Sequence, residues 1–176
     1  QSGKSETVAN VGAGMMILLP KLANMRDEDG KFIYPQLSNF VSGYKVGIFA
    51  PSNLQSTTTY SRLRDRITAM HARVILDSAE FALEGHESLW PPVANSREFF
   101  QLNNGSLCQQ MTADKNAKIE SKTYHLILLD ESQELDSYVV GKSIMPMGAS
   151  TNATTVATGT PGITKGYFYN MIATNK

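Results

Sequence analysis

The sequence lacks three features that would point to particular classes of protein. It has one cysteine, Cys108, among 176 residues, so no disulfide can form within the chain, which fits a reducing compartment. Its longest apolar run, residues 15–19, ends at Pro20, far short of the roughly 20 residues that a membrane span needs. Its formal net charge is zero, which argues against a strongly basic nucleic-acid coat protein. The length fits one domain with a sizeable core.

Alternating helical and strand patterns indicate the fold class. Apolar spacing predicts helices at 4–22, 54–72, 139–147 and 164–173, and strands at 46–50, 124–129 and 154–158. Residues 98–102 and 106–111 flank Asn103-Asn104-Gly105, which predicts a β-hairpin. Residues 24–43 predict a connection with room for a short hairpin, and residues 82–96 a loop or insertion. The alternation predicts an α/β fold with a mostly parallel sheet and helices on both faces.

The first five residues, Gln1-Ser2-Gly3-Lys4-Ser5, match the second half of a Walker A phosphate-binding loop. In such a loop, backbone N–H groups at a helix N-terminus point at the anion. Gly3 lets the backbone approach the phosphates, Lys4 can reach the β and γ phosphates, and the Ser5 hydroxyl can ligate Mg²⁺. A surface turn is the alternative, because Gly-Lys-Ser also occurs by chance. We expect further residues ahead of Gln1, because a protein does not naturally begin inside such a loop.

A Walker B pattern, Leu126-Ile127-Leu128-Leu129-Asp130-Glu131, lies far downstream. Asp130 ends a hydrophobic strand, and the carboxyl ends of strands are where open α/β sheets bind ligands. Its carboxylate can hold Mg²⁺, and Glu131 beside it can polarise the attacking water. The alternative is an ordinary polar exit from a strand. Together the two motifs predict that the protein hydrolyses a nucleoside triphosphate.

A third pattern, residues 156–161, is a strand that runs into a Thr/Gly turn. The hydroxyls of Thr158 and Thr160 could sense the γ phosphate and relay its state to moving parts. A tight turn built from β-favouring threonines is an equally good interpretation of the sequence.

Other reactive side chains give weaker signals. The three histidines share no metal-ligand spacing with one another or with Cys108, which we interpret as a small core residue. Three arginines, Arg62, Arg66 and Arg73, lie on or just beyond one predicted helix. A solvated face is the simpler interpretation, and an arginine that completes a neighbouring subunit's site is the alternative.

These patterns, in this order, resemble the ATPase domain of the large terminase subunit of tailed bacteriophages. The matching segments are Gln1-Ser2-Gly3-Lys4-Ser5, Ile48-Phe49-Ala50-Pro51-Ser52-Asn53-Leu54-Gln55, Leu102-Asn103-Asn104-Gly105-Ser106, Ile127-Leu128-Leu129-Asp130-Glu131-Ser132-Gln133 and Ala157-Thr158-Gly159-Thr160-Pro161. The resemblance extends over nearly the whole chain. It implies a P-loop NTPase fold of the ASCE type, in which residues 1–176 form the motor domain, truncated at its N-terminus inside Walker A. The family's adenine-contacting segment and first strand would precede Gln1, and its nuclease domain would follow Lys176, so we expect no DNA cleavage by this chain alone.

The resemblance also implies a set of roles. ATP and Mg²⁺ would be the cofactors, with Gln1, Ser2, Gly3, Lys4 and Ser5 at the nucleotide. Ser5 and Asp130 would hold the metal, Glu131 would be the catalytic base, and Thr158, Gly159 and Thr160 would couple hydrolysis to movement. The expected partners are double-stranded viral DNA, the portal protein, the small terminase subunit and further copies in a ring, without a membrane, in the host cell cytoplasm.

Two other function classes stay open from the sequence. A superfamily 2 helicase core has an Asp-Glu-x-Gln box similar to residues 130–133 and a Ser/Ala-Thr motif similar to Ala157-Thr158. It would need a second motor domain. A non-catalytic nucleotide-binding assembly module is the third class, and Glu131 beside Asp130 argues against it.

Overall fold

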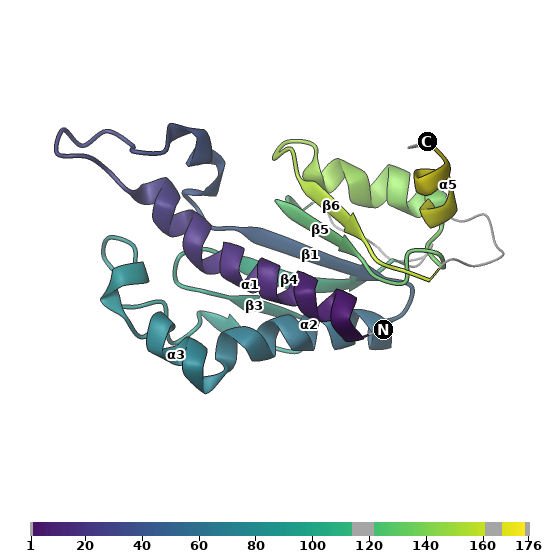
Figure 1. The fold of residues 1–176 in the computed structure, drawn as a ribbon, viewed down its shortest axis with the longest axis horizontal. Coiled ribbons are helices and arrows are strands. Elements are labelled where there is room, and N and C mark those ends of the chain that lie inside the picture. The colour runs from purple at the N-terminus through teal and green to yellow at the C-terminus, as the bar shows by residue number, and fades with distance from the viewer. Residues whose placement is uncertain (1, 114–121, 161–166, 175–176) are drawn as a thin grey trace.

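The computed structural model describes residues 2–113, 122–160 and 167–174. A six-stranded sheet lies between helices (Figure 1). The helices and strands are α1 (Ser2–Asn24), η1 (Pro35–Phe40), β1 (Lys45–Ala50), α2 (Asn53–Thr68), α3 (Met70–Leu76), η2 (Ala79–Phe81), β2 (Ala94–Asn95), β3 (Phe99–Gln101), β4 (Leu107–Thr112), β5 (Leu126–Leu129), α4 (Ser137–Val139), η3 (Val140–Ile144), η4 (Met145–Gly148), β6 (Thr154–Ala157) and α5 (Tyr167–Thr174).

The strand order is β2-β3-β4-β1-β5-β6. The four strands from β4 to β6 are parallel, and β3 pairs with its neighbours β2 and β4 in antiparallel fashion. The predicted hairpin is therefore β3–β4, and its turn contains Gly105 at φ +82°, a conformation that glycine adopts without strain. This confirms the predicted α/β fold with a mostly parallel sheet and a hairpin.

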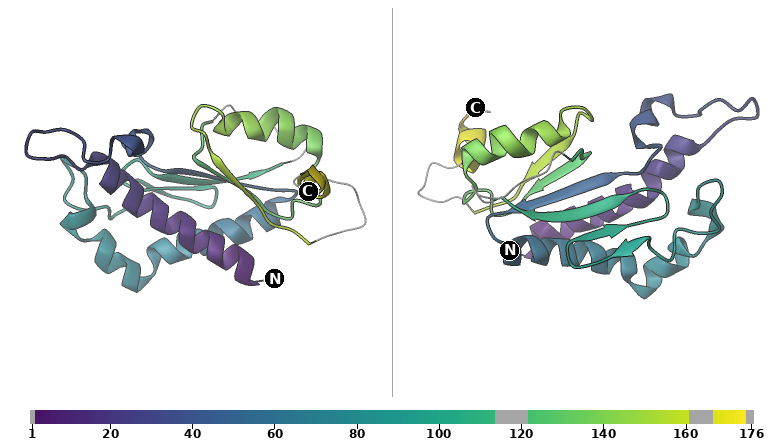
Figure 2. Two further views of the ribbon diagram at one scale, coloured as in Figure 1. Left: turned by 45° about the horizontal axis from the view of Figure 1, so that its top comes forward. Right: turned by 180° about the vertical axis from the view of Figure 1, so that it is seen from behind.

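Successive residues of the central strands point to opposite faces of the sheet, and each face has its own apolar core. On one face, Val46, Ile48, Leu126 and Leu128 pack in the cluster that includes residues of α1 and α2. On the other face, Phe49, Ile127 and Leu129 pack with the helical segment 137–148. Figure 2 shows α1 and α2 on one side of the sheet and the 137–148 segment on the other. Helices cover both faces, as the sequence predicts.

Helix α1 is fastened to the β3–β4 turn through a backbone carbonyl. Pro20 lies inside the helix and has no N–H, so the carbonyl of Met16, four residues earlier, lacks its usual helical donor. Asn104 Nδ2 donates to that oxygen over 2.9 Å and Ser106 Oγ over 2.7 Å, and both side chains are buried. Pro20 thus leaves the Met16 carbonyl free to accept the hydrogen bonds from Asn104 and Ser106.

Two elements differ from the sequence prediction. The predicted helix 54–72 is two helices, α2 and α3, because Ala69 between them is extended (φ −60°, ψ 148°). The predicted helix 139–147 is an α-helical turn followed by a π segment and a 3₁₀ segment, with Pro146 in the last. The connection 24–43 contains η1 and an antiparallel bridge between Arg26 and Phe32, which agrees with the short hairpin expected there. The start of the predicted helix 164–173 lies outside the described residues.

No helix within the described residues combines the length and the apolar character that crossing a bilayer requires.

Candidate functional site

The parallel register brings the predicted site residues to one edge of the sheet. Phe49 lies opposite Leu129, and Leu129 lies opposite Ala157. The residues that follow each of these, Ala50 at the end of β1 and Asp130 and Thr158 just after β5 and β6, therefore lie at the same level. This is the carboxyl edge, where parallel α/β sheets place their ligands.

A small pocket opens at this edge. Its lining consists of residues from all three sequence motifs: Lys4, Ser5, Asp130, Glu131, Thr158, Gly159 and Thr160. Three segments that are far apart in the sequence thus meet at one pocket. Gln1 of the predicted phosphate loop lies outside the described residues, as does Pro161 at the end of the third motif. The roles of these residues stay predictions, because their proximity alone does not show what they do.

The described residues of the predicted phosphate loop, from Ser2 to Ser5, form the start of α1. Ser2 and Gly3 begin the helix, and the Thr7 hydroxyl donates to the Gly3 carbonyl over 2.9 Å. Lys4 is exposed and Ser5 is partly buried at the pocket. The next residue, Glu6, forms an ion pair with Arg66 of α2. The first turn of α1 thus contributes Lys4 and Ser5 to the pocket lining, and a lysine near a helix N-terminus suits an anion.

Two hydroxyls from different elements hold the Asp130 carboxylate. Thr158 Oγ1 donates to Oδ1 over 2.8 Å, and Thr59 of α2 donates to Oδ2. The Glu131 N–H also donates to Oδ1 over 3.1 Å. Carboxylate and hydroxyl oxygens are the ligands that Mg²⁺ prefers, and one or two carboxylates besides phosphate suffice for it. Asp130 and Ser5 therefore fit a magnesium–phosphate group.

No sequence pattern predicted a role for Thr59, since its contact with Asp130 depends on how α2 packs against the sheet. The only sequence signal is a run of hydroxyl residues, Ser56 to Thr59, in a helix that is otherwise amphipathic. Both Ser56 and Thr59 are buried. Buried polar side chains nearly always have hydrogen-bond partners, so their burial indicates contacts with other polar groups.

Glu131 has an unusual backbone conformation. Its φ is +48°, in the left-handed region that residues other than glycine adopt infrequently. Its carbonyl accepts a hydrogen bond from Glu134 N over 2.9 Å, and its carboxylate accepts one from Gln133 Nε2 over 2.6 Å. The side chain next to the predicted metal ligand is thus held by a tight turn that follows β5.

The three predicted helix arginines do not share one role. Arg66 pairs with Glu6, and Arg73 pairs with Asp77 over 3.4 Å and lies 4.3 Å from the Trp90 ring centre. These contacts support structural roles for two of the three. Cys108 is fully buried on β4, and burial raises the pKa of its thiol, as expected of a core residue.

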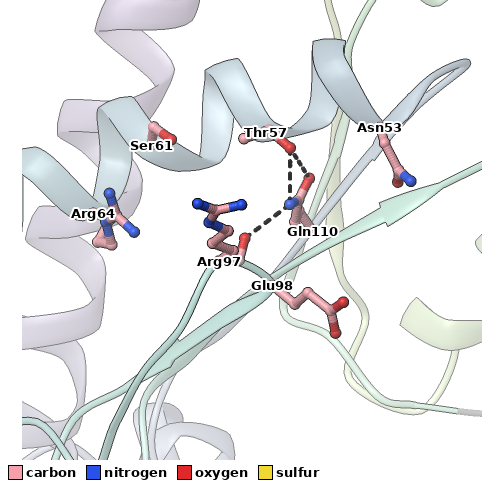
Figure 3. Close-up of a pocket in the computed structure, with 7 residues that line it drawn as sticks. All are labelled: Asn53, Thr57, Ser61, Arg64, Arg97, Glu98 and Gln110. Carbon is pink, nitrogen blue, oxygen red and sulfur yellow. Dashed lines mark hydrogen bonds between the residues drawn. The ribbon is translucent and has the colours of Figure 1, made fainter.

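A second, larger polar pocket, of about 520 Å³, lies between α2 and the β3–β4 hairpin and shares no lining residue with the candidate site (Figure 3). Its lining is Asn53, Thr57, Ser61, Arg64, Arg97, Glu98 and Gln110. At its base, Gln110 Nε2 donates to Thr57 Oγ1 over 3.0 Å and to the Arg97 carbonyl over 2.8 Å. The sequence patterns did not indicate this pocket, because no functional motif connects the residues that line it.

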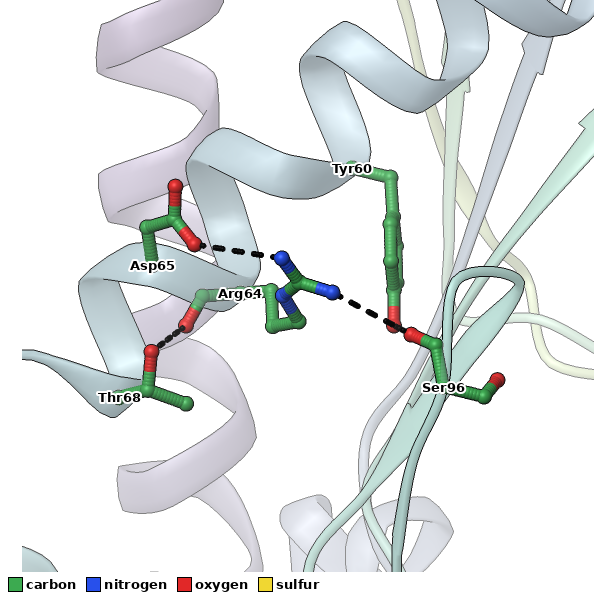
Figure 4. Close-up of polar contacts among 5 residues, drawn as sticks. All are labelled: Tyr60, Arg64, Asp65, Thr68 and Ser96. Carbon is green, nitrogen blue, oxygen red and sulfur yellow. Dashed lines mark hydrogen bonds and ion pairs between the residues drawn. The ribbon is translucent and has the colours of Figure 1, made fainter.

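Polar contacts beside this pocket fix α2 against the segment that precedes β3 (Figure 4). The Ser96 carbonyl accepts from Tyr60 over 2.8 Å and from Arg64 over 3.5 Å, while Arg64 also pairs with Asp65 at 3.6 Å. Burial raises the pKa of Tyr60, so its hydroxyl stays a donor in this contact. The helix that supplies Thr59 to the candidate site is therefore anchored along its length.

No protein-family model matches this sequence, and no curated protein matches it. Among solved structures, the fold is similar to the large terminase ATPase domain of Thermus phage P74-26. A point mutant of that domain aligns with 97% of this chain at a TM-score of 0.63 and 16% identity, and another structure of the domain aligns with 92% at 0.59 and 15%. The chain covers 60% and 57% of those two chains. The likeness establishes that this chain has the fold of a terminase ATPase domain.

Proposed function

We propose that this chain is an ATPase that powers the translocation of double-stranded viral DNA into a procapsid, as the motor domain of a phage terminase large subunit. The observation that carries the proposal is the single pocket that joins Lys4 and Ser5 at the start of α1 with Asp130 and Glu131 after β5. The turn at 158–160 lines the same pocket. The fold likeness supports the choice of motor.

Each side chain has a distinct role in this proposal. Lys4 and the N-terminal N–H groups of α1 bind the β and γ phosphates. Ser5 and Asp130 hold Mg²⁺, which would neutralise charge on the phosphates when bound. The hydroxyls on both oxygens of Asp130 fix its orientation, as outer partners of metal ligands commonly do. Glu131 takes the proton of the attacking water.

The proposed partners follow from the fold likeness and the motifs. They are double-stranded DNA, the portal protein, the small terminase subunit and further copies of the chain in a ring, in the host cell cytoplasm. Thr158, Gly159 and Thr160 would couple the loss of the γ phosphate to movement, because a differential contact of this kind shifts a two-state element.

Replacing Lys4 by alanine in the full-length protein tests the proposal. The variant removes the charged donor that faces the phosphates, so ATP affinity should fall about tenfold to a hundredfold. Lys21→Ala is the matched control, because it removes a lysine from the last turn of the same helix. Titration of a fluorescent ATP analogue and Mg²⁺-dependent phosphate release are the measurements. Unchanged affinity and turnover in Lys4→Ala would reject the phosphate-loop assignment.

A second experiment distinguishes DNA packaging from unwinding by a helicase-type motor. Portal-bearing proheads and a linear duplex are supplied to the full-length ATPase in parallel assays. Packaging of the duplex supports the terminase motor. Strand separation without packaging would favour the helicase-type motor, and ATP binding without any turnover would favour an assembly module.

A further inference from the structure

The side chain of Gln133 spans two parts of the candidate site. Its amide nitrogen Nε2 donates to Glu131 Oε2 over 2.6 Å. Its amide oxygen Oε1 accepts from the backbone N–H of Thr160 over 3.1 Å. One carboxamide therefore contacts the proposed base with one end and the turn after β6 with the other. None of the roles assigned above involves this residue.

The turn after β6 is shaped to receive this carboxamide. A Cβ on Gly159 would lie 2.3 Å from Gln133 Oε1 and 3.1 Å from Ser132 Oγ, which is too close for the amide oxygen to stay in place. Ser132 adds two hydrogen bonds of 2.9 Å, from its N–H and its hydroxyl, to the Thr158 carbonyl. Ser132 and Gln133 thus hold the turn by three hydrogen bonds. Of these two side chains, only that of Gln133 also forms a hydrogen bond with Glu131.

The Glu131 carboxylate depends on this contact for its position. Within the described parts of the chain, the hydrogen bond from the Gln133 amide is the one that this carboxylate accepts. The contact engages Oε2 and leaves Oε1 able to accept a hydrogen from water. Because the Glu131 backbone is already in the left-handed region, loss of the Gln133 contact would free the side chain of a residue whose conformation is strained.

We propose that Gln133 is a positioning residue: it orients the Glu131 carboxylate and links it to the turn formed by Thr158, Gly159 and Thr160. This inference rests on the proposed ATPase function. Any movement of the Thr160 N–H moves the acceptor end of the carboxamide, and the donor end carries that movement to the base. The rate of hydrolysis and the state of the turn are then coupled through one side chain.

Two substitutions in the full-length protein test this role. Gln133→Met keeps the length of the side chain and removes both hydrogen bonds, while Gln133→Glu keeps the acceptor for Thr160 but places a like charge beside Glu131. Both should lower single-turnover hydrolysis by about tenfold to a hundredfold, the cost of a misplaced catalytic group. ATP affinity should stay within about twofold, because Gln133 does not line the phosphate pocket. Unchanged hydrolysis in both variants would overturn the proposal.

Gln109→Met is the matched control. Gln109 on β4 accepts hydrogen bonds from Lys122 and Tyr124, so this variant also loses the contacts of a partly buried glutamine, away from the pocket. The thermal midpoint of each variant shows whether the fold is intact. A fall in hydrolysis in Gln109→Met as large as in Gln133→Met would mean that the loss reflects destabilisation, and would overturn the positioning role.

A double-mutant cycle separates action through Glu131 from a general structural effect. If Gln133 acts by orienting the Glu131 carboxylate, Gln133→Met should cause little further loss in a Glu131→Gln background. Multiplying losses would overturn the inference. Wild-type protein in the same assay separates this inference from its premise: absence of hydrolysis by the wild type rejects the ATPase function, whereas normal hydrolysis by both wild type and Gln133→Met rejects only the role of Gln133.

Discussion

The Thr158 hydroxyl donates a hydrogen bond of 2.8 Å to the Asp130 carboxylate, although 28 residues separate them in the sequence. The contact joins the ends of two neighbouring parallel strands, β5 and β6. Thr59 holds the other oxygen of the same carboxylate from α2. The orientation of Asp130 is therefore set by the fold, before any ligand binds, and a change at Thr158 is felt directly at the proposed metal ligand.

Thr158 gives the first prediction. Thr158→Ala in the full-length protein should leave ATP binding largely intact but lower the DNA packaged per ATP consumed, because the turn loses its direct contact with Asp130. Thr160→Ala should lower the same ratio. Thr158→Ser keeps the hydroxyl and is the control. A packaging assay with portal-bearing proheads, run beside phosphate release, measures the ratio. Wild-type ratios in both alanine variants would leave the turn with a structural role only.

Glu131→Gln should separate binding from chemistry. The amide keeps the shape of the side chain but cannot accept the proton of the attacking water. Nucleotide affinity should persist while single-turnover hydrolysis falls by about a hundredfold or more, the size of a general-base contribution. Glu134→Gln, at an exposed site three residues away, is the control. A loss in Glu134→Gln instead would identify that residue as the base.

Gly159→Ala should impair the site more than the fold. The new methyl group would displace the end of the Gln133 side chain, which is flexible, so we expect a loss of stability of about 1 kcal/mol, at the low end for overpacking. Hydrolysis should fall because the Gln133 contacts with Glu131 and Thr160 would break. Gly14→Ala, inside α1 with open space around its Cβ position, should instead raise stability by about 0.5–1 kcal/mol. Chemical denaturation and single-turnover hydrolysis of both variants check this contrast.

His125 makes stability depend on pH. Its Nδ1 accepts from the Lys45 N–H over 2.9 Å, its Nε2 lies 3.1 Å from the Asn39 carbonyl, and its ring stacks on Tyr44. Burial lowers the pKa of this histidine, and the nearby Lys45 charge lowers it further. Because the folded pKa lies below the unfolded value, the unfolded state binds more protons, so stability is lost as pH falls below about 6.5.

Chemical denaturation at pH 7.5 and pH 5.5 measures this effect. Wild-type protein should be less stable at pH 5.5, and His125→Gln should show a smaller difference because it cannot be protonated. His71→Gln, which removes an exposed histidine from α3, should keep the wild-type difference. Equal pH dependence in wild type and His125→Gln would show that other groups cause it.

The sequence predicted the central sheet and the site edge because both depend on local signals. Unbroken apolar runs marked β1 and β5, and the residue after each buried strand necessarily reaches the carboxyl edge. The sequence therefore sufficed to predict that Lys4, Asp130 and Thr158 meet at one pocket. The division of α2 from α3 at Ala69 was missed, because no glycine or proline marks it and helical spacing continues through it.

Tertiary packing explains this break and the residues that the sequence did not reveal. After Ala69 the chain turns so that Leu76 is buried and its carbonyl accepts from the N–H groups of Leu89 and Trp90. Thr59 reaches Asp130 only because α2 lies against the sheet, and Gln133 reaches Thr160 only across two strand ends. Such contacts join distant segments, and the hydrophobic periodicity of either segment does not predict them.

The hydrogen bonds at the Met16 carbonyl connect α1 directly to the β3–β4 turn. Pro20 leaves the Met16 carbonyl to Asn104 and Ser106, so this point is tied to the sheet while the Lys4 end, about 18 Å away along the axis, meets the pocket. Ala9 and Ala13 pack in the core between Lys4 and Met16, so a displacement of the pocket end on phosphate release would have to move α1 together with the helix that it packs against, α2. Such a displacement would reach the segment after α1, because Asn24 at the end of the helix donates to the Val41 carbonyl. Distances between spin labels on that segment and on the β3–β4 turn, with and without nucleotide, would reveal this movement, and constant distances would mean that α1 stays fixed.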